Sequence, residues 1–134
     1  MAQTVYGRSF SKDFRGPLNA DCVDTQFYIA EVPCQVVGVV YDHATAGNDA
    51  GAVNLQLTKL TDTQALGSGT AMLTNNTNAG FDCKATAQTR QTGTLTGTTA
   101  TLQLAVGDKL CADFTGTPTT LAGVIMTVVL KPIA

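Results

Sequence analysis

The sequence of 134 residues has no tryptophan, a single histidine and few charged side chains, which make up 13% of the chain. Typical soluble domains carry roughly 25% charged residues, so the surface of this protein is weakly charged. No apolar run approaches the roughly 18 residues that cross a bilayer, and the N-terminus lacks the apolar centre of a signal peptide. We therefore expect no membrane partner and no secretion.

The net charge of −2 gives the chain no overall attraction for nucleic acid, and we expect no nucleic-acid partner. Hydrophobic residues make up 44% of the sequence, which is too high for a disordered chain of such low net charge. The length is in the usual range of one domain. The composition thus favours a single folded domain.

Residue types that perform catalysis are scarce. The only histidine, His43, follows Asp42 in a turn-prone stretch of small and polar residues, and we expect it in a solvent-exposed loop. None of the three serines lies in a G-x-S-x-G turn. Asp42, Asn48 and Asp49 are a weak calcium candidate because they lack the dense ligand spacing of a calcium loop. We expect no enzyme activity, no cofactor and no metal.

Four cysteines are present: Cys22, Cys34, Cys83 and Cys111. No pair has the close spacing of a zinc site. Nothing marks the chain as secreted, and free cysteine is commonly buried as a small hydrophobic residue. We expect reduced, buried thiols, with one structural disulfide as the alternative.

From residue 24 onward, short β-branched and apolar stretches alternate with turn signals. Residues 34–41 form a nearly continuous apolar run, and residues 53–59 alternate strictly between apolar and polar. Further strands are expected at residues 26–32, 72–73, 81–89, 100–104, 110–114 and 121–130. About eight strands without a convincing helix predict an all-β fold, an antiparallel two-sheet β-sandwich with a jelly-roll topology. The abundant threonine fits this prediction because it is β-branched.

Residues 1–20 differ from the rest, with a net charge of +2 against −4 for residues 21–134. We interpret residues 1–20 as an N-terminal arm and residues 21–134 as the β-sandwich domain. In the arm, aromatic residues recur every four positions among basic ones. The predicted contact residues for a capsid or a sister subunit are Tyr6, Arg8, Phe10, Lys12, Phe14 and Arg15. The alternative is that these aromatic side chains cap the domain's own core.

Residues 36–132, about three-quarters of the chain, carry a pattern that resembles small virion proteins of tailed bacteriophages. The residues that carry it are Val53, Leu55, Leu57 and Lys59; Gly67-Ser68-Gly69; Gln91-Thr92-Gly93-Thr94-Leu95-Thr96; Leu102, Leu104, Gly107-Asp108, Leu110 and Asp113-Phe114-Thr115-Gly116-Thr117; and Leu121-Ala122-Gly123-Val124 with Val128-Val129-Leu130-Lys131-Pro132. Within these virion proteins, the chain is similar to capsid decoration, or cement, proteins.

The resemblance implies a non-enzymatic protein on the capsid exterior of a virion, made in the cytoplasm of a host bacterium. Its implied partners are the major capsid protein and further copies of itself, with a homotrimer favoured over a dimer. The alternative is a receptor- or glycan-binding module of a tail fibre or spike. Glycan sites present aromatic platforms, and the candidates outside the arm are Phe27, Tyr28, Tyr41, Phe81 and Phe114.

Overall fold

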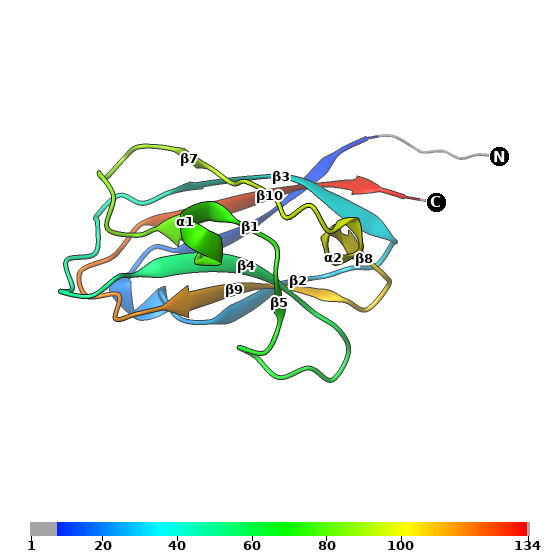
Figure 1. The fold of residues 1–134 in the computed structure, drawn as a ribbon, viewed down its shortest axis with the longest axis horizontal. Coiled ribbons are helices and arrows are strands. Elements are labelled where there is room, and N and C mark those ends of the chain that lie inside the picture. Colours follow the sequence, from blue (N-terminus) through cyan, green and yellow to red (C-terminus); the bar gives the residue numbers. More distant parts are fainter. Residues whose placement is uncertain (1–7, 134) are drawn as a thin grey trace.

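The computed structural model describes residues 8–133 and shows two antiparallel β-sheets packed face to face (Figure 1). Sheet A contains, in order, β1 (Phe10–Gly16), β10 (Val124–Pro132), β3 (Cys34–Asp42) and β7 (Gln91–Thr92), and β8 (Gln103–Leu104) also pairs with β3. Sheet B contains β2 (Thr25–Ile29), β9 (Lys109–Thr115), β4 (Asn54–Leu60) and β5 (Thr70–Ala71), and β6 (Phe81–Asp82) also pairs with β4. The predicted all-β two-sheet sandwich is confirmed, whereas the jelly-roll topology stays a prediction.

In β4, the apolar residues of the alternating sequence face the core. In β4, Leu55 and Leu57 are fully buried between the sheets, in a cluster that also holds Val36 and Val39 of β3. Met126, Val128 and Leu130 of β10 complete this part of the core. Alternate residues of a strand point to opposite faces, which explains why every second residue of β10 enters the core.

Within residues 8–133, three short helical turns connect the strands: η1 (Asn19–Asp21), α1 (Asn75–Asn78) and α2 (Thr99–Leu102). In α1, Asn76 and Thr77 have positive φ angles of 53° and 54°, so this segment is a left-handed turn. The strand predicted over residues 100–104 is wrong for its first half, which is the helical turn α2. The predicted strand over residues 81–89 shrinks to the two residues of β6.

The separate arm predicted over residues 1–20 is corrected by the position of β1. This strand is antiparallel to β10 along its whole length, from Phe10 opposite Leu130 to Gly16 opposite Val124. It begins at the end of the sandwich where β10 ends (Figure 1). The sandwich therefore includes residues that the sequence assigned to the arm. Residues 1–7 lie outside the described residues.

Candidate interaction surface

His43 has a structural role, and the expectation of an exposed loop histidine is wrong. Only 1% of its surface is exposed. Its Nδ1 lies 2.7 Å from the Tyr41 hydroxyl oxygen, and its Nε2 lies 2.8 Å from the carbonyl oxygen of Ala85. A carbonyl oxygen only accepts, so Nε2 donates to it. Both ring nitrogens are thus engaged in hydrogen bonds inside the protein.

All four cysteines are buried and free, which confirms the predicted reduced thiols. Burial raises the pKa of Cys83 to about 12 and that of Cys111 to about 11, because the low-polarity interior disfavours the charged thiolate. The thiolate is the reactive form of cysteine. These side chains therefore act as small core residues and not as nucleophiles.

Asp42 and Asp49, from the weak calcium candidate, form short-range hydrogen bonds with the backbone. Asp42 Oδ1 accepts the backbone N–H of His43 at 2.8 Å, and Asp49 Oδ2 accepts that of Gly51 at 3.1 Å. Within residues 8–133, no group of three or more His, Cys, Asp or Glu side chains is placed to hold a metal ion.

The aromatic residues of the predicted contact strip pack inward. Phe14 is only 3% exposed and lies edge-on to Phe114, with ring centroids 5.7 Å apart; its centroid is 6.2 Å from that of Phe27. Phe10 is half-buried and meets Tyr28 edge-on at 6.2 Å. The alternative interpretation is therefore the correct one for Phe10 and Phe14, which join the two sheets at one side of the sandwich.

The basic residues of the same strip stay at the surface. Arg8, Lys12 and Arg15 are all exposed, and Lys12 lies with its Nζ 5.3 Å from the ring centroid of Tyr28. Arg15 forms an ion pair of 3.2 Å with Asp13, two positions away on β1. Tyr6, the remaining predicted contact residue, lies outside the described residues. The structure thus packs the aromatic side chains Phe10 and Phe14 inward and leaves the basic side chains exposed.

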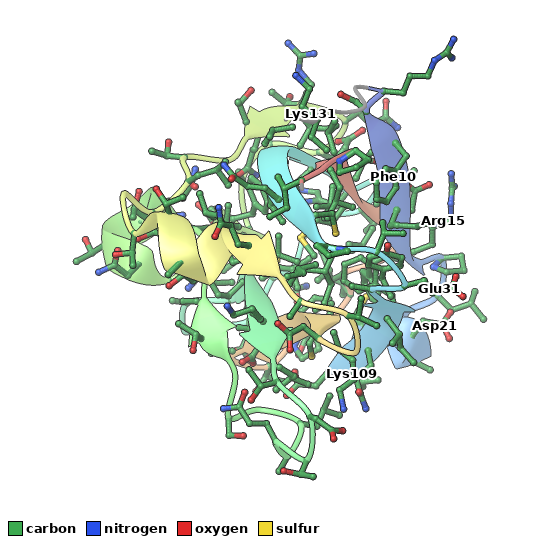
Figure 2. The ribbon with its side chains drawn as sticks, turned by 90° about the vertical axis from the view of Figure 1, so that its right-hand side faces the viewer. Phe10, Arg15, Asp21, Glu31, Lys109 and Lys131 are labelled. Carbon is green, nitrogen blue, oxygen red and sulfur yellow. The ribbon has the colours of Figure 1, made fainter. Side chains whose placement is uncertain are left out.

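A shallow open groove of about 410 Å³ runs between the edge strands β1 and β2 and ends at η1. It is lined by Asp13, Phe14, Arg15, Pro17, Ala20, Asp21, Val23, Thr25 and Phe27. Figure 2 shows Arg15 of β1 and Asp21 of η1 on this side of the molecule. Asp13 and Arg15 from the strand and Asp21 from the turn therefore flank the same groove.

Two exposed apolar residues border this region, and the sequence analysis did not single them out. Leu18 is 66% exposed and Val23 is 56% exposed. They flank η1, which is fastened to the rest of the sandwich by hydrogen bonds from Asn19 Nδ2 to the carbonyl oxygens of Pro118 and Leu121. Residues 17–23 have no periodic apolar pattern. The exposure of Leu18 and Val23 therefore could not be predicted from the sequence.

The aromatic candidates for a glycan platform are not available as open ring faces. Tyr41 and Phe81 are buried and stacked on each other, with centroids 4.9 Å apart. Phe27, Tyr28 and Phe114 are half-buried against the core. Lys12 lies over the ring of Tyr28.

Comparisons of the chain with protein families, with curated proteins and with solved structures found no match. In the part of the chain that the structure describes, no helix has the length and apolar character needed to cross a membrane.

Proposed function

We propose that the chain is a non-enzymatic structural protein of a phage virion, which decorates and stabilises the capsid by binding the outer surface of the major capsid protein. The observation that carries the proposal is the exposed basic edge of the sandwich. Arg8, Lys12 and Arg15 project along β1 and the residues just before it, whereas residues 21–134 have a net charge of −4. Exposed arginine beside apolar side chains is a common composition of binding surfaces.

The role of the polar side chains supports a structural protein. His43, Asp42 and Asp49 are all held in hydrogen bonds that stabilise local backbone or the core. Acid–base catalysis requires such groups to reach a substrate at hydrogen-bond distance. The resemblance of residues 36–132 to capsid decoration proteins supports the same proposal.

The test is cosedimentation of the purified chain with phage heads that lack it. The heads come from the phage whose genome encodes this protein. Deleting residues 2–16 would remove β1 and disrupt sheet A, so surface substitutions are the cleaner design. The doubly substituted Arg8→Glu, Lys12→Glu chain should bind at least about tenfold more weakly, because two favourable contacts become repulsive.

Arg90→Glu is the matched control, since Arg90 is exposed near β7, on the opposite edge of sheet A. It should bind heads like the native chain. Failure of the native chain to sediment with heads would contradict the proposal. Binding on a glycan array without affinity for heads would favour the tail-fibre or spike alternative.

A further inference from the structure

The strand β1 is an open edge of sheet A among the described residues, because β10 is its one hydrogen-bonded neighbour. Its seven residues pair with β10 without a register shift. The other edge on this side, β2, has a register shift between Gln26 and Tyr28. The edges at the far side are strands of two residues each. A long, regular open edge is a template for another strand.

The side chains of β1 alternate along this edge. Phe10 and Phe14 point toward the sandwich, so Ser11, Asp13 and Arg15 lie on the outer face of sheet A. Asp13 and Arg15 are thus neighbours of opposite charge on one face. Charged side chains on an edge strand normally discourage pairing. Here Asp13 and Arg15 have opposite charges, so pairing is favourable only with a strand that places a cation opposite Asp13 and an anion opposite Arg15.

A second copy of the chain has that order when the two β1 strands run antiparallel. When sheet A of one copy continues into sheet A of the other, the residues that lie opposite each other across the junction point to the same face of the sheet. A two-fold axis at Phe14 places Asp13 of each copy opposite Arg15 of the other, which forms two ion pairs across the junction. An axis at Asp13 would place two aspartates opposite each other, and an axis at Lys12 two lysines. Both of these registers oppose like charges.

In the same register, residues at the η1 end of the groove of each copy lie near the junction. Lys12 of one copy lies opposite Gly16 of the other, next to the turn η1 that carries Asp21. Leu18 and Val23, which flank η1, come close to the junction at each end. A standard interface covers about 800 Å² on each partner, roughly an eighth of the 6561 Å² surface of this chain. The paired strands and these apolar side chains would supply the contacts of such an interface.

We propose that the protein forms a two-fold dimer in which β1 pairs antiparallel with β1 of a second copy, in the register centred on Phe14. Sheet A then continues from one copy into the next. The inference concerns self-association and is tested without capsids, but the dimer would cover the same strand β1 that the proposed function assigns to capsid binding. It differs from the homotrimer that the resemblance to decoration proteins implies, because two-fold pairing of one strand with itself closes the assembly at two copies.

The experiment is to measure the solution mass of the full chain by light scattering across a concentration series. The native chain should have twice the monomer mass at high concentration. Asp13→Arg gives a chain with cations at positions 13 and 15, and Arg15→Asp gives one with anions at both. Each variant alone should dissociate at least about tenfold more readily than the native dimer. An equimolar mixture of the two should recover the dimer, because all facing charges are then opposite.

Asp62→Arg and Arg90→Asp are the matched controls, because both native side chains are exposed and lie outside β1. Each control should keep the native mass, and circular dichroism should verify that all variants fold. A monomeric or trimeric native chain would overturn the proposal. So would a dimer that both variants of β1 leave intact, since it would use another face. A mixture that fails to associate would overturn the register.

Discussion

His43 is a polar side chain that the fold has enclosed, and its environment explains why it tolerates burial. Placing a polar group in the interior is unfavourable unless its hydrogen bonds are satisfied. When the imidazole is neutral, Nε2–H donates to the Ala85 carbonyl and Nδ1 accepts from the Tyr41 hydroxyl. The ring also lies edge-on to Tyr41, with centroids 5.4 Å apart. The pair therefore joins the end of β3 to the segment that follows β6.

Replacing His43 by leucine should lower the free energy of unfolding by about 2–3 kcal/mol, because the Tyr41 hydroxyl and the Ala85 carbonyl lose their partner. Adding Tyr41→Phe to His43→Leu removes the unpaired hydroxyl. The double variant should then lose less stability than the sum of the two single variants. Urea unfolding of all four proteins measures this coupling. Strict additivity would show that the two side chains do not stabilise each other.

The position of His43 could not be predicted from its local sequence. Residues 42–51 are small and polar, which is typical of an exposed turn. The carbonyl that accepts from the ring belongs to Ala85, 42 positions further along the chain. Burial that depends on such a distant partner leaves no local pattern. The cysteines were predictable because their burial follows from an intrinsic property of the residue.

Among the elements, β1 shows how one spacing fits two structures. Phe10 and Phe14 are four positions apart, which places them on one face of a helix and equally on one face of a strand. The same spacing, with basic residues between the aromatic ones, predicts a contact strip on an N-terminal arm. The decisive information is the apolar strand β10, more than a hundred residues later, which supplies the hydrogen-bonding partner. The long strands β3, β4 and β9 are predictable because an apolar run or an alternating pattern lies within each segment.

Phe14 packs β1 against sheet B, and its truncation should strongly destabilise the protein. Phe14→Ala should lower the free energy of unfolding by about 3–5 kcal/mol, because it opens a cavity beside Phe27 and Phe114. Ser11→Ala is the control on the outer face of the same strand and should change stability by less than about 0.5 kcal/mol. Chemical denaturation compares the two. Equal, small effects would show that β1 contributes little to the core.

At the scale of the whole molecule, the buried thiols make the stability of the sandwich depend on pH. Burial raises the pKa of all four cysteines above the ordinary value of 9.0, and it also raises the pKa of Tyr41. The folded protein therefore keeps these protons to higher pH than the unfolded chain does. Where the unfolded chain binds fewer protons, the free energy of unfolding falls as pH rises. The thiols thus leave stability unchanged well below pH 9.0 and reduce it above that value.

Cys83 and Cys111 should each reduce the free energy of unfolding by about 1 kcal/mol at about pH 10, because their folded pKa values are about 12 and about 11. Urea unfolding under reducing conditions, repeated from about pH 7 to about pH 10, measures the decline. A Cys83→Ala, Cys111→Ala chain is the comparison. It should be less stable near neutral pH, since it loses two buried side chains, yet its stability should fall less steeply with pH. The slope that remains should come from Cys22, Cys34, Tyr28 and Tyr41, because burial raises the pKa of each. If the free energies of unfolding of the two chains fell in parallel with pH, ionisation of Cys83 and Cys111 would not be what limits the alkaline stability of the fold.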